Sequence, residues 1–215
     1  MDAISMEIDT PSMARSYQIE AFEKAGRQNT IVFLETGSGK TLIAIMLLRN
    51  HAYLLRKPSP FIAVFLVPQV VLVTQQADAL KTHTDLKVGM YWGDMGVDHW
   101  DAKTWMQERE KYEVLVMTPA ILVNCLRHSF LKLEMIHTLI FDECHHARGK
   151  HPYACIMTEF YHKKLQFKSS HLPKIFGMTA SIVKSKGSIS PSDYWEKISN
   201  LENLMNSKHA RLIEN

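Results

Sequence analysis

The sequence predicts an α/β domain in which a doubly wound parallel sheet is flanked by helices. Short apolar runs alternate with helical patterns along the chain, which is the order of elements in such sheets. The runs are rich in β-branched and aromatic residues, as expected for strands buried on both faces. Strands are expected at 30–35, 61–67, 86–91, 113–118, 135–141 and 174–178, and helices at about 12–26, 40–56, 69–82, 99–111, 119–127 and 152–163.

The length of 215 residues fits one large domain with short appendages. We expect a disordered tail at 1–11 and the domain itself at 12–183. Lys, Ser, Gly and Pro accumulate at 184–192, which indicates a loop. Apolar residues then recur at helical spacing, so 193–215 is expected to form an amphipathic helix and a tail.

Composition excludes several classes of protein. No stretch approaches the roughly 18–20 consecutive apolar residues of a membrane span, and residues 1–11 lack the basic and apolar parts of a signal peptide. The chain has 3 cysteines, an odd number that argues against a disulfide framework and for a reducing compartment, nucleus or cytoplasm. The net charge of +3 does not by itself indicate nucleic acid.

A glycine-rich loop follows the first expected strand and opens an apolar helix, as a phosphate-binding loop does. Gly37 and Gly39 allow a tight turn that directs backbone N–H groups at phosphate oxygens. Lys40 is expected to reach the β- and γ-phosphates, and the Thr41 hydroxyl to bind Mg²⁺. The general pattern has another glycine where this chain has Leu34, so an ordinary turn before a helix is the alternative. The residues expected to hold the nucleotide here are Thr36, Gly37, Ser38, Gly39, Lys40 and Thr41.

An acidic pair ends the expected strand at 135–141. Asp142 and Glu143 should therefore lie at the carboxyl edge of the sheet, where parallel α/β sheets bind ligands. We expect Asp142 to hold Mg²⁺ and Glu143 to orient and deprotonate the water that attacks the γ-phosphate.

Zinc is a rival explanation for the residues just after the acidic pair. Their side chains are of the types that bind zinc, but their spacing matches no standard finger. A solvated turn around 148–150 is the favoured alternative. The residues concerned are Cys144, His145, His146, His151 and Cys155.

Residues near other strand and helix ends complete the candidate site. Tyr17 and Gln18 have the chemistry to stack on adenine and to bond its edge, although Tyr17 in the core is an equal alternative. Thr179 and Ser181 follow the last strand, where two hydroxyls can link the γ-phosphate to a second ligand. Helix N-termini after two strands can bind a nucleic-acid backbone, with simple helix capping as the alternative. The residues at these two places are Pro68, Gln75, Thr118 and Pro119.

Taken in order, these segments resemble the core of superfamily 2 helicases. The D-E-C-H sequence narrows the resemblance to the double-stranded-RNA-dependent branch, which includes Dicer proteins and antiviral RNA sensors. The turn at 92–96, the histidines around 145–151 and the tail from Ile198 look more like Dicer than like the sensors, and the overall sequence resembles the plant Dicer-like proteins. The segments read ARSYQ from residue 14, TGSGKT from 36, VPQVVLVTQQ from 67, TPAIL from 118, DECH from 142 and TAS from 179.

The resemblance implies a RecA-like fold with ATP and Mg²⁺ as cofactors. It places Tyr17 and Gln18 at the adenine, and makes His145 a link between hydrolysis and RNA together with the two hydroxyls after the last strand. The catalytic residues that it implies are Lys40, Asp142, Glu143 and His145. The residues that it implies for RNA coupling are Pro68, Gln75, Thr118, Pro119, Thr179 and Ser181.

The partners implied by the resemblance are double-stranded RNA, a second helicase lobe with arginines, a ribonuclease III region and double-stranded-RNA-binding proteins. Within 215 residues we find only the first lobe, so we expect a fragment or short form that hydrolyses ATP slowly or not at all. Two alternatives stay open: a non-catalytic module that docks RNA or protein, and a related helicase of antiviral sensing or DNA repair.

Overall fold

The computed structural model describes residues 14–168, 171–180, 190–207 and 210–212. Within them seven strands form one sheet in the order β3-β4-β2-β5-β6-β1-β7, and every neighbouring pair is parallel. The predicted α/β class and doubly wound sheet are therefore confirmed. The strands are β1 (Thr30–Phe33), β2 (Ile62–Leu66), β3 (Val88–Tyr91), β4 (Val114–Met117), β5 (Ile136–Asp142), β6 (Lys174–Thr179) and β7 (Ala210–Leu212).

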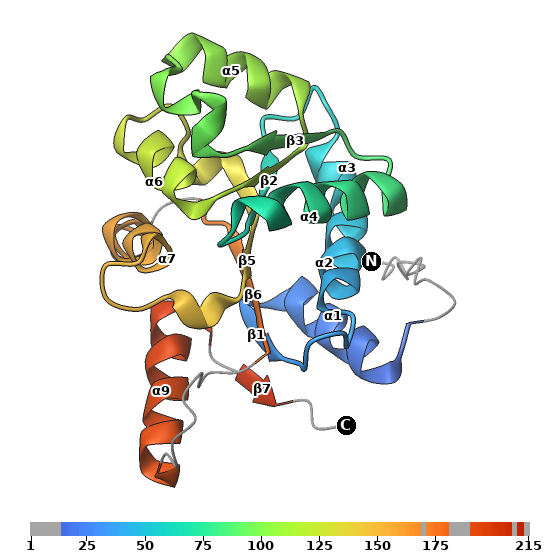
Figure 1. The fold of residues 1–215 in the computed structure, drawn as a ribbon, viewed down its shortest axis with the longest axis vertical. Helices are drawn as coiled ribbons and strands as arrows, with labels where there is room; N and C mark the ends of the chain where they lie inside the picture. The colour runs from blue at the N-terminus through green and yellow to red at the C-terminus, as the bar shows by residue number, and fades with distance from the viewer. Residues whose placement is uncertain (1–13, 169–170, 181–189, 208–209, 213–215) are drawn as a thin grey trace, which may run out of the picture.

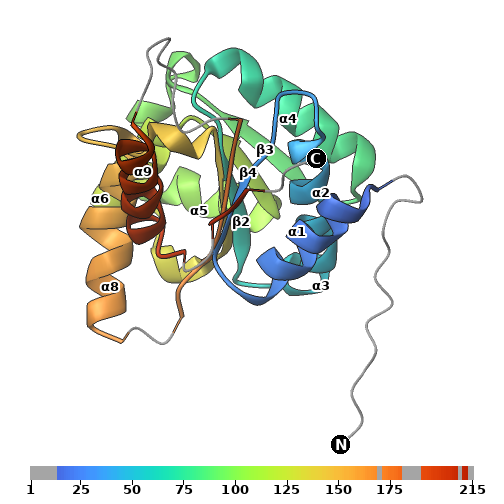
Figure 2. The ribbon, with the colours of Figure 1, turned by 90° about the horizontal axis from the view of Figure 1, so that it is seen from below.

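Helices cover both faces of the sheet (Figures 1 and 2). One face carries α1 to α4, whose apolar side chains form one core cluster with the strands. The other face carries α5 to α9 and a second cluster around Trp105 and Tyr153. The helices are α1 (Ser16–Arg27), α2 (Lys40–Asn50), α3 (Ala52–Leu55), α4 (Val70–His83), α5 (Ala102–Lys111), α6 (Pro119–Arg127), α7 (Pro152–Cys155), α8 (His162–Gln166) and α9 (Pro191–Leu204).

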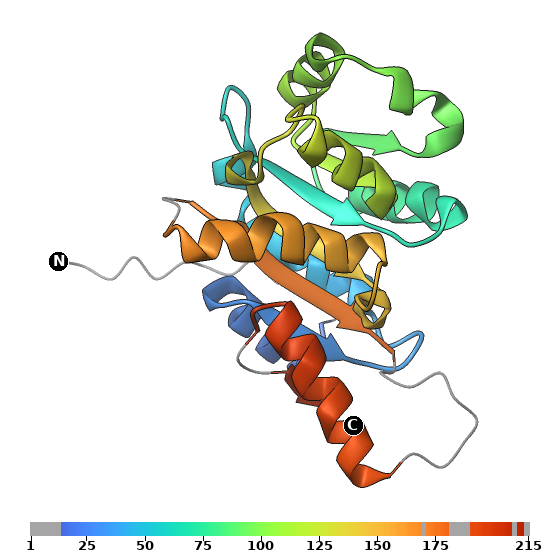
Figure 3. The same ribbon diagram turned by 90° about the vertical axis from the view of Figure 1, so that its left-hand side faces the viewer.

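Because all strands run in the same direction, their carboxyl ends lie along one edge of the sheet (Figure 3). Strands β2 to β6 are almost completely buried, so the core holds this edge in place from both faces. None of the described helices has both the length and the apolar character that a membrane crossing requires.

The structure differs from the predicted elements in four places. The helix expected at 40–56 is broken at His51, whose φ of −90° and ψ of 0° separate α2 from α3. The helix expected at 152–163 contains a π-helical turn, Ile156–Tyr161, between α7 and α8. Helix α9 starts at Pro191, inside the loop expected at 184–192, because the Ser190 side chain accepts a hydrogen bond from Asp193 N. Strand β7 was not predicted and pairs with β1.

Part of the predicted organisation lies outside the described residues. This applies to the tail expected at 1–11, the hydroxyl of Ser181 and residues 184–189 of the expected loop. The division of the chain at these points stays a prediction.

Candidate nucleotide site

The phosphate-binding loop lies between β1 and α2. Gly37 and Gly39 have φ of +85° and +82°, a left-handed backbone that favours glycine. A Cβ on Gly39 would also lie 2.3 Å from Nε2 of Gln18. Two independent constraints, backbone angle and space, therefore require glycine at position 39.

Tyr17 and Gln18 hold this loop from α1. The Tyr17 hydroxyl and Gln18 Nε2 each donate a hydrogen bond of 2.8 Å to the Ser38 carbonyl oxygen. Gln18 Oε1 accepts from Arg15 N at 2.8 Å, so its amide is fixed at both ends. Tyr17 is partly exposed at the rim of the core rather than inside it. The geometry gives both side chains a role in shaping the loop, and their contact with adenine stays a prediction.

Lys40 is held inside the loop that it follows. Its ammonium donates to the carbonyl oxygens of Leu34 at 2.9 Å and Glu35 at 3.2 Å. Its charge also favours the ionised forms of Asp142 and Glu143. The loop and the acidic pair therefore belong to one electrostatic site, although about 100 residues separate them in the chain.

Asp142 is the last residue of β5 and is only 6% exposed. Burial first, and then the charge of Glu143, raise the pKa of Asp142 to about 6. Its Oδ1 accepts a hydrogen bond of 3.0 Å from Glu143 N, and the Gln76 side chain favours its ionised form. A buried carboxylate of this kind is stabilised by a cation placed against it.

Glu143 has a different environment from its neighbour. Its φ of 48° and ψ of 50° are left-handed, a conformation that is uncommon outside glycine and turns the chain sharply away from β5. A hydrogen bond with His145 is the main reason that the pKa of Glu143 falls to about 2, against the opposing effect of burial. Two adjacent carboxyl groups thus have pKa values shifted in opposite directions, which is typical of sites where the two have separate roles.

His145 and Thr179 close a triangle with Glu143. The Thr179 hydroxyl lies 2.7 Å from His145 Nδ1 and donates to Glu143 Oε2 at 3.3 Å. His145 Nδ1 is itself 3.2 Å from Glu143 Oε2. Since Thr179 ends β6 and β6 lies between β5 and β1, this contact joins the acidic pair to the strand beside the loop.

Zinc is not favoured at the residues after Glu143. Cys144 is fully buried in the core beside Gly177, and burial raises its thiol pKa, which opposes the thiolate that zinc needs. Among the residues that the structure describes, no three His, Cys, Asp or Glu side chains are placed to hold a metal ion together.

The residues predicted to contact RNA lie along the same carboxyl edge. Pro68 follows β2, and Gln75 is exposed on α4. Thr118 follows β4 and precedes α6, whose first residue is the buried Pro119. The Thr118 hydroxyl makes no capping hydrogen bond, so side-chain capping does not explain it. Their contact with RNA stays a prediction.

Two residues at the site were missed in the sequence. Gln76 is 7% exposed and favours the ionised form of Asp142, and the helical spacing of buried Val73, Ala77 and Leu80 would have placed it on the inner face of α4. The buried Tyr153 hydroxyl donates to the carbonyl oxygens of Asp142 at 2.7 Å and Leu66 at 3.1 Å. Nothing in the sequence pattern indicates that Tyr153 makes these hydrogen bonds.

Known proteins resemble this chain in both sequence and fold. The family model described as DEAD/DEAH box helicase matches residues 15–186. Endoribonuclease Dicer homolog 2 of Arabidopsis thaliana is 71% identical over 97% of this chain. Endoribonuclease Dicer homolog 2a of rice, Oryza sativa subsp. japonica, is 60% identical over 93% of it. The matches cover only 16% and 14% of those two proteins, so this chain spans about a sixth of their length or less.

The fold agrees with a solved helicase structure. The Hef helicase domain of Pyrococcus furiosus superposes with a TM-score of 0.70 at 28% identity, and the match covers 93% of this chain and 38% of that one. The predicted RecA-like lobe and the predicted resemblance to plant Dicer proteins are thereby confirmed. With the family model covering most of its length, the chain belongs to the DEAD/DEAH box helicase family.

Proposed function

We propose that this chain is the ATP-binding lobe of a Dicer-like protein, in which ATP hydrolysis is coupled to double-stranded RNA. One observation carries the proposal: the loop at 36–41, the Asp142–Glu143 pair and the His145–Thr179 contact meet at one edge of the sheet. Its similarity to the plant Dicer homologues supports the choice of RNA.

The residues present fit ATP and Mg²⁺. The two left-handed glycines leave room for phosphate beside the loop N–H groups, and Lys40 adds a positive charge. Thr41 and the buried Asp142 would hold Mg²⁺, whose charge would offset the burial of that carboxylate. The bound metal would supply charge neutralisation on the phosphates.

Glu143 is suited to act on the attacking water. Its low pKa keeps it ionised at neutral pH, so it accepts a hydrogen bond from water and fixes the direction of attack. The triangle with His145 and Thr179 holds that carboxylate in one orientation. A shift of Thr179 would therefore change the orientation of the Glu143 carboxylate. Bound RNA would influence ATP hydrolysis in this way.

RNA would bind along the carboxyl edge beyond β2 and β4. The N-termini of α4 and α6 lie there and carry partial positive charge, which favours phosphate. Pro68, Gln75, Thr118 and Pro119 are the contacts that we propose, together with Ser181 beyond the described residues. The longer protein would act in the nucleus or cytoplasm with double-stranded-RNA-binding partners.

The other parts of the reaction would come from the rest of that protein. A second helicase lobe would add arginines, and an arginine finger contributes roughly 10³–10⁵ to rate where one operates. The two plant relatives are named as endoribonucleases, and we propose the same activity for the longer protein. The 215-residue chain alone should bind Mg-ATP weakly and hydrolyse it slowly; fast RNA-stimulated turnover by it would contradict this.

The direct test is Glu143→Gln in the full-length parent protein. Double-stranded-RNA-stimulated ATP hydrolysis should fall by roughly 10²-fold or more, with Mg-ATP binding retained, because only the group acting on water is lost. Glu23→Gln, at an exposed position on α1, is the matched control and should leave the rate unchanged.

Two results of this test would contradict the proposal. Undiminished hydrolysis would mean that another group activates water. Lost hydrolysis with normal RNA processing would show that hydrolysis is not coupled to processing, and would favour a docking role for the lobe in the longer protein.

A further inference from the structure

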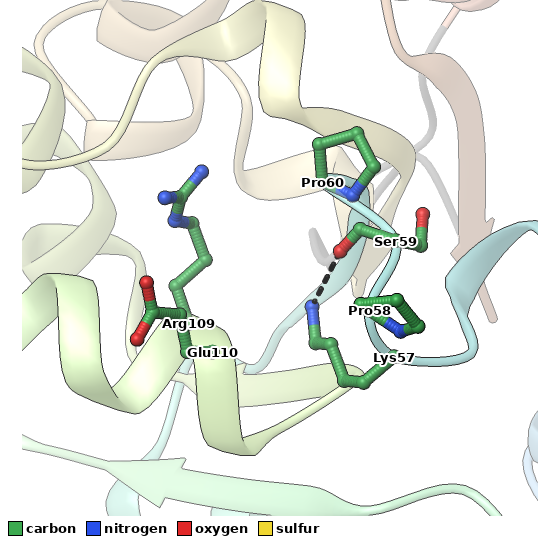
Figure 4. Close-up of a pocket in the computed structure, with 6 residues that line it drawn as sticks. All are labelled: Lys57, Pro58, Ser59, Pro60, Arg109 and Glu110. Atoms are coloured by element: carbon green, nitrogen blue, oxygen red, sulfur yellow. Dashed lines mark hydrogen bonds between the residues drawn. The ribbon is translucent and has the colours of Figure 1, made fainter.

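A pocket lies at the amino edge of the sheet, at the other end of the strands from the nucleotide site, and Figure 4 shows the side chains that line it. It lies between the segment just before β2 and the last turn of α5, which ends just before β4 begins. Its volume is about 660 Å³, within the usual range for small-ligand sites. The lining residues are Lys57, Pro58, Ser59, Pro60, Arg109 and Glu110.

Two cationic side chains face this pocket from opposite walls (Figure 4). Lys57 Nζ donates only to the carbonyl oxygens of Ser59 and Phe61, both at 3.3 Å. Arg109 Nη1 donates to the Met135 sulfur at 3.1 Å, and a thioether is a weak acceptor. Among the described residues, neither cation forms an ion pair with a carboxylate.

The buried carboxylate of Glu113 interacts with groups other than the Lys57 ammonium. Glu113 accepts hydrogen bonds from the backbone N–H groups of Lys57 at 3.2 Å and Lys87 at 2.9 Å, and Arg56 lies 3.7 Å from it. It therefore leaves the Lys57 ammonium without a direct carboxylate contact. Burial, and then the charge of Arg109, lower the pKa of Lys57 despite the two acids nearby.

Like charges held across a pocket repel each other, and an anion between them turns the repulsion into attraction. The planar guanidinium offers paired N–H donors that match a carboxylate or a phosphate. Pro58 and Pro60 add rigid apolar surface for the body of a ligand. Glu110 at the rim offsets one of the two positive charges, which favours a ligand of low charge.

We propose that this pocket binds an oxyanion, a carboxylate or phosphate group carried by a small molecule or a peptide, between Arg109 and Lys57. The site is separate from the loop at 36–41, because the two lie at opposite ends of the strands. It does not depend on the proposed hydrolysis of ATP.

Thermal unfolding of this chain at low ionic strength tests the proposal, with inorganic phosphate and triglutamate peptide as separate probes. The variants are Arg109→Met and Lys57→Met, which keep apolar stems, and Lys103→Met on the exposed part of α5 as control. Without anion, the two pocket variants should raise the melting temperature by about 1–3 °C, because the repulsion is removed. The control should not.

Either probe should then raise the melting temperature of the wild type and control by several °C more than that of the pocket variants. Phosphate also fits the loop at 36–41 and acts generally as a salt, but every variant retains the loop, so the difference between variants reports the pocket. A larger effect of phosphate identifies a phosphate ligand, and a larger effect of triglutamate a carboxylate ligand. Equal shifts in wild type and Arg109→Met with both probes would overturn the proposal.

Discussion

The ionisable groups at the two edges of the sheet have pKa values that are shifted in different ways. At the carboxyl edge, burial raises the pKa of Asp142, a hydrogen bond with His145 lowers the pKa of Glu143, and the positive charge of Lys40 favours the ionised form of both. At the amino edge, the perturbed groups include bases such as His51 and Lys57, whose pKa values are lowered. The carboxyl edge thus holds two acids whose pKa values are shifted in opposite directions, whereas the amino edge disfavours the charge of its bases.

The histidines of the amino edge illustrate the second environment. His51 and His137 both place Nδ1 against the Thr138 hydroxyl, at 2.8 and 3.0 Å, and their rings meet edge to face at 4.6 Å. Burial is the first cause that lowers the pKa of His51 to about 3 and of His137 to about 4. Other positive groups, His171 and Lys174 among them, add to this. Both rings are therefore neutral in the folded protein at neutral pH.

Acid should weaken the fold through these rings, and this is the largest stability effect that we expect. Their folded pKa values lie below the unfolded value near 6.5, so the unfolded chain binds more protons as pH falls. The contribution of these rings to the free energy of unfolding should be at its maximum above pH 6.5. The free energy of unfolding should then drop by roughly 2–3 kcal/mol by pH 4. Urea unfolding across this range measures it.

His51→Gln should flatten that pH dependence, because it removes the more strongly shifted of the two rings. The exposed His99→Gln is the control and should retain the wild-type slope. Equal slopes in the wild type and His51→Gln would show that the ring is not kept neutral by its surroundings.

The two carboxylates of the other edge should respond to neutralisation with opposite signs. Asp142→Asn should raise the free energy of unfolding by roughly 1–2 kcal/mol at neutral pH, because burial disfavours this charge. Glu143→Gln should lower it by a similar amount, because His145 stabilises that charge. Denaturant unfolding without nucleotide or metal compares them, and a change of the same sign in both would contradict the separate environments.

The smallest effect that we expect distinguishes two adjacent glutamines. Gln76→Leu removes a polar side chain that favours the ionised form of Asp142, so the Mg²⁺ concentration needed for ATP binding should rise roughly three- to tenfold. Gln75 lies on the exposed face of α4, so Gln75→Leu should change RNA binding instead. Titration of fluorescent ATP with Mg²⁺ measures the first effect, and titration with labelled duplex RNA measures the second. Identical ATP curves for Gln76→Leu and wild type would remove Gln76 from the metal site.

Much of the carboxyl edge can be predicted from the sequence because its signals are local. The apolar runs before Gly37 and Asp142 mark strands, and the residues directly after the strands of a parallel sheet lie together at one edge. The contact between His145 and Thr179 depends instead on the strand order, which brings β5 and β6 together. The resemblance to known helicases implied a shared coupling role for these two residues, but the contact between them was not predicted.

The amino edge could not be predicted, because its features come from tertiary packing. Lys57 and Arg109 meet only after two strand–helix units have folded, and no local pattern links them. The break at His51 is likewise invisible in a continuous apolar helix pattern. The three-residue strand β7 is too short for periodicity to detect.

The central claim is that the loop at 36–41 and the acidic pair form one Mg-nucleotide site, and calorimetric titration of this chain with ATP tests it most directly. Binding should require Mg²⁺ and should weaken by roughly tenfold or more in Lys40→Ala, because the loop loses its positive charge. In Asp142→Asn, the dependence on Mg²⁺ should largely disappear. If both variants bind ATP as the wild type does, with the same requirement for Mg²⁺, the nucleotide site lies elsewhere and the account is wrong.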